Sequence, residues 1–191
     1  MSTMKPVTHF NFRNITITGN VGVGKSTLTE NLKTILEPIG WTFYSVSQLQ
    51  RQWIKDHNIP LEQTLLRPDA HEREIEAEVK RRLEQHEHQV LDGWLTGFMA
   101  QGIPAVLKVL VICSDDAVRI DRVANRDDIT IDEAKTLIRE RERQNVEKWH
   151  AIYGKHDFWD PKIYDLVIDT YSVSKVEAPK LVLSKLGFIP A

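Results

Sequence analysis

The chain has 191 residues, of which 41% are hydrophobic and 27% charged, as in a soluble globular domain, with or without an inserted lobe. This composition excludes a disordered chain. The 25 basic and 27 acidic residues give a net charge of −2, so no global positive field would attract nucleic acid. The single cysteine, Cys113, excludes an internal disulfide and a cysteine-based zinc cluster.

The sequence contains no run of 18 apolar residues and no apolar block near its first residue. We therefore expect no membrane span, no signal peptide and a cytoplasmic protein. Cys113 ends the apolar run 109–113 (VLVIC), where a buried, inert thiol is the simplest interpretation.

The first part of the chain predicts an N-terminal tail over residues 1–12, followed by one domain over 13–191. Residues 13–18 (RNITIT) are β-branched and precede glycines, which predicts a strand that ends in a turn. Residues 26–36 have leucine and isoleucine at helical spacing. Residues 41–46 (WTFYSV) predict a second strand.

The middle of the chain is more polar. Residues 47–57 predict a helix that is interrupted before Pro60. Residues 69–87 are dense in Glu, Arg and Lys, with apolar residues every fourth position, which predicts a helix with one thin apolar stripe. Residues 89–91 predict a short strand before the Asp-Gly turn at 92–93.

The last part begins with residues 106–113 (VLKVLVIC), an almost continuous apolar run that predicts a strand buried on both faces. Two arginine-rich helices follow over 115–125 and 132–152, then a strand over 164–168 and a helix over 174–186. Because strands and helices alternate, the chain predicts an α/β fold with a parallel sheet of about five strands and helices on both faces.

Residues 19–26 (GNVGVGKS) fit the phosphate-loop pattern G-x-x-x-x-G-K-[ST] between a predicted strand and a predicted helix. Glycines let backbone N–H groups turn inward around an anion, and the helix N-terminus adds partial positive charge. Lys25 can reach the β- and γ-phosphates of a nucleoside triphosphate, and the Ser26 hydroxyl can ligate Mg²⁺. The expected nucleotide-binding residues are Gly19, Asn20, Val21, Gly22, Val23, Gly24, Lys25, Ser26 and Thr27.

The arginine distribution bears on the type of reaction. No guanine-reading N-K-x-D sequence is present, and a motor ATPase usually requires a larger chain. Phosphoryl transfer to a small acceptor instead requires a lid that excludes water. Six of the twelve arginines suit such a lid: Arg119, Arg122, Arg126, Arg139, Arg141 and Arg143. The alternative is a solvated helix face in which arginines pair with Asp and Glu.

Further segments have distinctive sequences: 45–51 (SVSQLQR), 91–93 (LDG), 114–133 (SDDAVRIDRVANRDDITIDE), 139–142 (RERE), 153–154 (YG) and 164–170 (YDLVIDT). Together they resemble the small nucleoside monophosphate kinases, especially the archaeal-type cytidylate kinases, over roughly residues 13–185. This resemblance implies a P-loop NTPase-type fold with a helical acceptor-binding insert near 47–88 and a lid near 119–143.

The resemblance also implies residue roles. Arg51 belongs to the lobe that holds the acceptor monophosphate, and four arginines belong to the lid and phosphate clamp: Arg122, Arg126, Arg139 and Arg141. Asp92 is placed beside the phosphate loop, where its carboxylate can hold Mg²⁺ through water; its alternative role is to form the Asp-Gly turn.

The acceptor side departs from the family pattern. Trp94 stands where the family commonly has arginine, Ser47-Gln48 replace a glycine–acid pair, and Gln50 replaces a phenylalanine. Gln48 and Trp94 are therefore candidate residues for choosing the acceptor base, although a tryptophan after a turn is more often a packing residue.

The resulting hypothesis is a monomeric enzyme that transfers the γ-phosphoryl group of ATP·Mg²⁺ to a nucleoside monophosphate. CMP is the first choice, followed by UMP or dCMP, and neither nucleic acid nor a membrane is an expected partner. Two alternatives stay open. One is a kinase for another small acceptor, and the other is a nucleotide-binding regulatory module without turnover.

Overall fold

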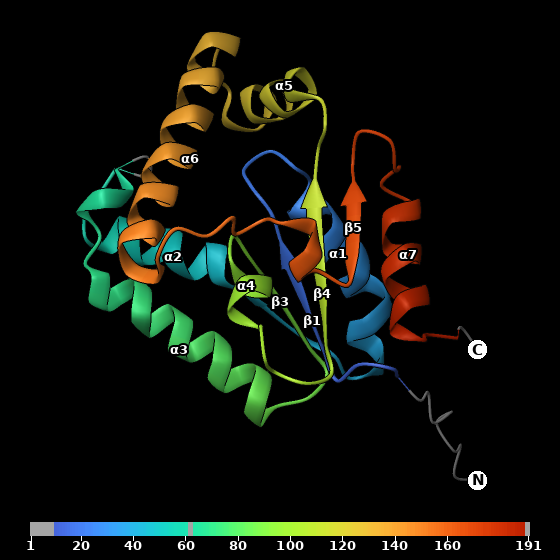
Figure 1. Cartoon of the computed structure of the whole chain (residues 1–191). Helices are drawn as coiled ribbons and strands as arrows, with labels where there is room; N and C mark the ends of the chain where they lie inside the picture. Colours follow the sequence, from blue (N-terminus) through green and yellow to red (C-terminus); the bar gives the residue numbers. More distant parts are fainter. Residues whose placement is uncertain (1–9, 61–62, 190–191) are drawn as a thin grey trace, which may run out of the picture.

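The computed structural model describes residues 10–60 and 63–189, and five parallel strands form its centre (Figure 1). The strand order is β2-β3-β1-β4-β5, so the strand before the phosphate loop is the middle one. The strands are β1 (Asn14–Thr18), β2 (Thr42–Ser45), β3 (Gln89–Gly93), β4 (Val106–Ile112) and β5 (Leu166–Asp169).

The register of the sheet brings the predicted site residues to one edge. Thr18 pairs with Gly93 on one side and with Leu110 on the other, and Ser45 pairs with Asp92. Because all strands are parallel, the phosphate loop after β1 and the ends of β2 and β3 lie together.

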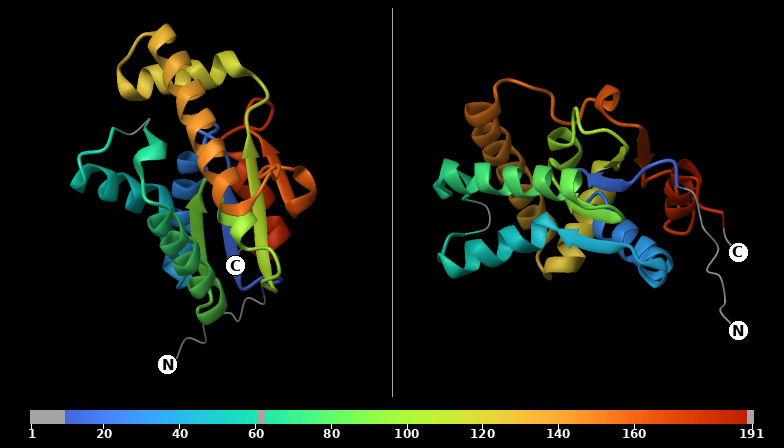
Figure 2. Two further views of the ribbon diagram at one scale, coloured as in Figure 1. Left: turned by 60° about the vertical axis from the view of Figure 1, so that its left-hand side comes forward. Right: turned by 90° about the horizontal axis from the view of Figure 1, so that it is seen from below.

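Two apolar cores cover the sheet. The larger core contains α1 (Lys25–Leu36) and α7 (Glu177–Leu186), with leucines such as Leu32 and Leu186 fully buried. The second core joins α3 (Asp69–Gln85), α4 (Thr96–Met99) and the carboxyl-terminal part of α6 (Ile131–Tyr153). Figure 2 shows α1 and α7 on the opposite side of the sheet from α3 and α6.

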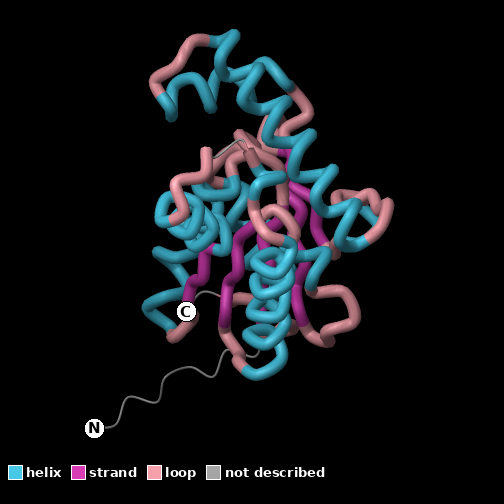
Figure 3. Tube along the Cα trace, turned by 90° about the vertical axis from the view of Figure 1, so that its left-hand side faces the viewer, coloured by secondary structure: helices cyan, strands magenta, loops and turns pink. Residues whose placement is uncertain are grey.

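Two insertions begin at the carboxyl edge of the sheet. The first, between β2 and β3, consists of α2 (Val46–Asp56), the short 3₁₀ helix η2 (Thr64–Leu66) and α3. The second, after β4, consists of α5 (Asp116–Asp127) and α6 (Ile131–Tyr153), which extend beyond the strand ends as an arm (Figures 1 and 3). Thr130 and Glu133 begin α6 with a reciprocal capping box.

The predicted α/β fold is confirmed, and most predicted boundaries agree within a few residues. The prediction missed α4 and the 3₁₀ helices η1 (Glu37–Ile39), η2 and η3 (Pro161–Ile163). The strand predicted for 89–91 continues as β3 through Gly93, so Asp92 lies within a strand rather than in a turn.

Residues 1–9 of the predicted tail lie outside the described residues, but the remainder of the tail is packed. The backbone N–H of Asn11 donates to the Leu186 carbonyl at 2.8 Å, and Phe10 packs edge-on against Trp41. In the described part of the chain, no helix is both long enough and apolar enough to span a membrane.

Candidate active site

The phosphate loop joins the central strand directly to a helix. β1 ends at Thr18 and α1 begins at Lys25, so the loop backbone lies against the N-terminus of the helix. Gly22 and Gly24 have φ values of 75° and 94°, which a residue with a Cβ rarely adopts. Glycine at these two positions therefore permits the inward turn of N–H groups that an anion requires.

Lys25 folds back onto this loop. Its Nζ donates to the carbonyl of Gly19 at 2.6 Å and to that of Asn20 at 2.5 Å. Burial lowers the pKa of Lys25 to about 7, against the opposing attraction of Asp92, and the nearby arginines lower it further. A phosphate in the loop would supply the missing negative charge and raise this pKa.

A cavity of about 500 Å³ extends from the phosphate loop across the carboxyl edge of the sheet. Its walls come from α1, the start of α2, the end of β3, both arm helices and the loop after β5. Six cationic side chains line the cavity but only two acidic ones, Glu30 and Asp92. The cations are Lys25, Arg51, Arg122, Arg126, Arg141 and Lys175. This imbalance suits a ligand with several negative charges.

Arg141 is the most buried of the cavity arginines, with 7% of its surface exposed. Burial lowers the pKa of Arg141 to about 10, and Arg51 and Arg126 add to this effect. Its Nε has no hydrogen-bond partner among the described residues, and its guanidinium lies 5.5 Å from the ring centroid of Trp94. The Asp127 carboxylate opposes this lowering of the Arg141 pKa only in part. An anionic ligand in the cavity would therefore stabilise the buried guanidinium.

The other predicted arginines differ in their surroundings. Arg51 is exposed at the cavity wall, and Arg126 pairs with Asp127 at 2.6 Å. Arg122 donates to the Thr170 hydroxyl at 2.8 Å and to the Thr170 carbonyl at 3.0 Å. Arg122 thus lines the cavity while it fixes the loop after β5 to α5.

The structure does not bring Arg139 to this cavity. Arg139 is exposed and lines a separate cavity of about 160 Å³ on another side of α6. A separation of two residues along a helix corresponds to a rotation of about 200° around its axis, so Arg139 and Arg141 point in nearly opposite directions. The structure therefore does not support the prediction that both belong to one phosphate clamp in this arrangement.

Asp92 and Ser26 form the candidate metal side of the cavity. The Ser45 hydroxyl donates to Asp92 Oδ1 at 2.5 Å, and burial raises the pKa of Asp92, opposed by Ser45 and Lys25. Among the described residues, no group of three or more His, Cys, Asp or Glu side chains is placed so that it could hold a metal ion. One carboxylate and one hydroxyl fit Mg²⁺ that takes its remaining ligands from phosphate and water.

Most of the acceptor-side residues that differ from the family pattern also border the cavity. Ser47, Gln48 and Trp94 line it, whereas Gln50 points away and donates to Glu72 at 3.1 Å. Trp94 has the packing contacts expected of it, while its role in choosing the acceptor base stays a prediction. It forms part of the cavity wall and packs edge-on against Trp149 at 5.7 Å.

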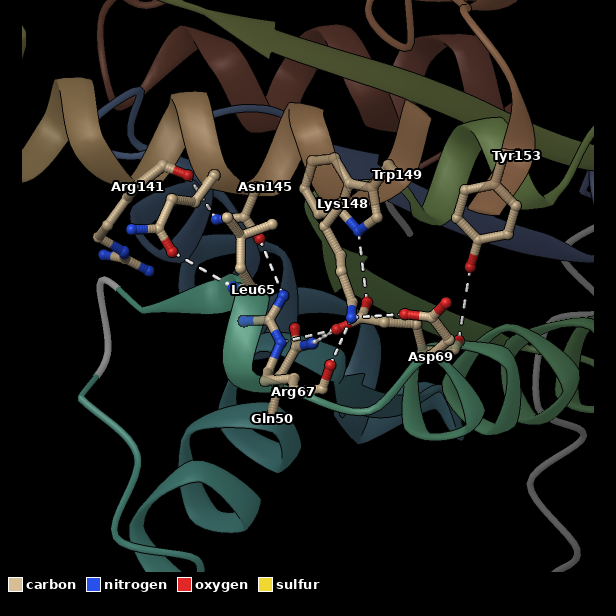
Figure 4. Close-up of polar contacts among 11 residues, drawn as sticks. Gln50, Leu65, Arg67, Asp69, Arg141, Asn145, Lys148, Trp149 and Tyr153 are labelled. Carbon is tan, nitrogen blue, oxygen red and sulfur yellow. Dashed lines mark hydrogen bonds and ion pairs between the residues drawn. The ribbon is translucent and has the colours of Figure 1, made fainter. Parts of the chain in front are cut away.

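Sequence reasoning missed a buried polar network between the first insertion and α6 (Figure 4). Arg67 donates to Glu72 at 2.7 Å and to Asn145 at 3.0 Å, and Lys148 binds the Arg67 carbonyl and Asp69. The residues of α6 on this face are all buried: Arg141, Gln144, Asn145, Lys148 and Trp149. Their spacing of three and four is that of a buried helix face, but four of the five are polar.

Comparisons with known proteins identify the family and the fold of the chain. Residues 14–172 match the model of the cytidylate kinase-like family. The chain is 36% identical over 159 residues to a cytidylate kinase of Pyrococcus furiosus and 38% identical over 160 residues to one of Thermococcus sibiricus. Each match covers 82% of this chain and 79% of the relative.

Two solved kinases show a similar fold at low sequence identity. A gluconokinase of Sinorhizobium meliloti has a TM-score of 0.59 and 16% identity, and the match covers 93% of both chains. A shikimate kinase of Acinetobacter baumannii has a TM-score of 0.54 and 14% identity, with 91% of this chain and 92% of that one covered. These neighbours support the parallel α/β kinase fold.

Proposed function

The chain belongs to the cytidylate kinase-like family and is a nucleoside monophosphate kinase, and we propose that it transfers the γ-phosphoryl group of ATP to CMP. UMP and dCMP are the next acceptors in this proposal. The relatives named cytidylate kinase support the choice of CMP, while Trp94, Ser47 and Gln48 are the positions that would alter it.

The cavity is the observation that carries this proposal. A phosphate loop with Lys25 borders one part of it, and Arg51 borders another, with Arg126 and Arg141 also in its walls. Two phosphorylated substrates would therefore meet inside one strongly cationic space. Phosphoryl transfer depends mainly on aligning these substrates and stabilising the charge of the migrating group.

We assign the cations to different parts of the reaction. Lys25 and the loop amides bind the β- and γ-phosphates of the donor, and Arg51 binds the acceptor phosphate. Arg126 and Arg141 stabilise the group in transfer, since both stand on the arm that would cover the substrates. Covering the site would exclude water, so that CMP and not water receives the phosphoryl group. No general base is required in this assignment.

Mg²⁺ would be held by Ser26 and, through water, by Asp92. When bound, it neutralises charge on the β- and γ-phosphates. The proposed enzyme is a monomer.

A coupled assay of ADP release with CMP, UMP, dCMP, AMP and GMP tests the proposal. We expect the highest kcat/KM with CMP and no measurable transfer by Lys25→Ala, which should still fold because its lost charge faces the loop. If the parent protein phosphorylates none of these monophosphates, the proposal is wrong. A different small acceptor or a binding module without turnover would then take its place.

A further inference from the structure

The tip of the phosphate loop is inserted into the arm that stands over it. Val21 is only 5% exposed, and it packs with Val123 and Ala124 of α5 and with Ala134 and Ile138 of α6. This small core is separate from the two cores that cover the sheet. A lid that moved freely over the loop would leave such a side chain exposed.

The loop backbone also touches α5 directly. A Cβ on Gly22 would lie 2.9 Å from the Arg119 carbonyl oxygen and 3.1 Å from a methyl group of Val123. The loop and the first turns of the helix are thus in van der Waals contact, with no space for a side chain between them.

Three successive carbonyls of the loop accept hydrogen bonds from side chains outside the loop. The Val21 carbonyl accepts from Arg119 Nε at 3.4 Å, and the Gly22 carbonyl accepts from Arg122 at 3.4 Å. The Val23 carbonyl accepts from the Thr170 hydroxyl at 2.8 Å. Because C=O and N–H point in opposite directions across a peptide plane, fixing these three oxygens also fixes the directions of the amides that follow them.

Arg119 is itself fixed from both arm helices. Its guanidinium donates to Asp116 of α5 at 3.0 Å and to Glu142 of α6, and its side chain is only 13% exposed. Glu142 is the neighbour of Arg141 in the chain. The contact between Glu142 and Arg119 therefore also limits the rotation of α6 that directs Arg141 into the cavity.

We propose that Val21, Arg119 and Glu142 are positioning residues that join the base of the arm to the phosphate loop. They hold the loop amides in the orientation that binds phosphate, and they fix the face that α6 presents to the cavity. None of the three side chains needs to touch the substrate. The inference rests on the proposed function only in taking a nucleotide as the ligand of the loop.

Calorimetric binding of ADP·Mg²⁺ tests this coupling without reference to the acceptor. We expect Arg119→Met, which keeps the apolar stem, and Val21→Ala each to raise the Kd about tenfold, the effect of losing one contact of ordinary strength. Glu142→Gln keeps an oxygen that accepts from Arg119, so its Kd should change less than threefold. Glu142→Met removes the acceptor and should raise the Kd about as much as Arg119→Met does. Combining these two variants should add little, because both break the same contact.

Two controls separate positioning from a general loss of stability. Val182→Ala removes the same two methyl groups as Val21→Ala, but from the core around α7, where the side chain is fully buried. It should lower the Tm and leave the Kd for ADP unchanged. Arg81→Met removes an exposed arginine that is paired with Glu78, and it should change neither value.

Parental affinity in both Arg119→Met and Val21→Ala would overturn the inference, as would an equal loss of affinity in Val182→Ala. The inference and the proposed function fail separately. A parent protein that binds ADP but phosphorylates no monophosphate would refute the function, while the variants would still show whether the arm positions the loop.

Discussion

Replacing Arg141 with methionine should make the ligand-free protein more stable and the enzyme much slower. The guanidinium is buried, faces other cations and leaves Nε without a partner among the described residues. Such a group opposes folding until an anion binds beside it. Methionine retains most of the apolar stem and removes the charge.

The size of the effect follows from the site. Burial lowers the pKa of Arg141 to about 10, and this displacement from the ordinary arginine value corresponds to about 3 kcal/mol against the charged form. The substitution also removes the contact between the guanidinium and Trp94, which offsets about 1 kcal/mol of this gain in stability. A net gain of about 1–2 kcal/mol raises the Tm of a chain of this length by about 3–6 °C. By analogy with arginine fingers, kcat should fall by about 10³.

Thermal unfolding in a buffer without phosphate measures the first effect, since phosphate itself would bind the cavity arginines. With saturating ADP and CMP, the parent protein should have the higher Tm, because these ligands stabilise the parent more than they stabilise Arg141→Met. Arg143→Met is the matched control. Arg143 lies on the same helix, and its side chain is 54% exposed and paired with Glu140 and Glu147. It should change the Tm by less than about 1 °C.

A ligand-free Tm of Arg141→Met below that of the parent would refute the claim that the buried charge of Arg141 opposes folding of the ligand-free protein. A parental kcat would refute the role of Arg141 in transfer. The two results are independent, so each part of the reasoning can fail alone.

Three other predictions concern the remaining cations and the acceptor wall. The pKa of Lys25 is about 7 without ligand, and bound phosphate raises it. Binding of ADP should therefore be accompanied by uptake of about 0.9 proton at pH 8, by little uptake at pH 6 and by none in Lys25→Met. Calorimetry in buffers of different ionisation enthalpy measures this uptake. Arg51→Ala should raise KM for every accepted monophosphate by a similar factor, whereas Gln48→Ala or Trp94→Ala should change the ranking of CMP, UMP, AMP and GMP. Arg139→Met should lower kcat less than twofold in the coupled assay, and a loss of about 10³ would return Arg139 to the clamp.

The sequence predicted the parts of this protein that local patterns determine. Apolar runs, glycine turns and helical spacing placed all five strands and the phosphate loop, because these features depend on neighbours in the chain. The four-residue helix α4 left no such pattern. It is fixed by distant contacts, such as the Gly97 N–H that donates to the Thr18 hydroxyl at 2.7 Å.

The arginine-rich helices show where pattern reasoning stops. A run of arginines predicts a cationic surface, but only the rotation of α6 separates the buried Arg141 from the exposed Arg139. The spacing of two residues in a helix would have predicted that these two arginines point in different directions. No sequence pattern would have predicted that Lys148 and Arg67 are buried, because both residue types are usually exposed and their partners lie far away in the chain.

Transfer of a radioactive γ-phosphoryl group from ATP to CMP tests the central claim most directly. With Mg²⁺ present, the label should appear in CDP at the rate at which ADP is released, and Lys25→Ala should abolish both. This outcome would show that the chain transfers the γ-phosphoryl group to CMP and that the transfer depends on the phosphate loop. Label that appears only as inorganic phosphate, or that stays in ATP while CMP is unchanged, would contradict the proposed cytidylate kinase activity.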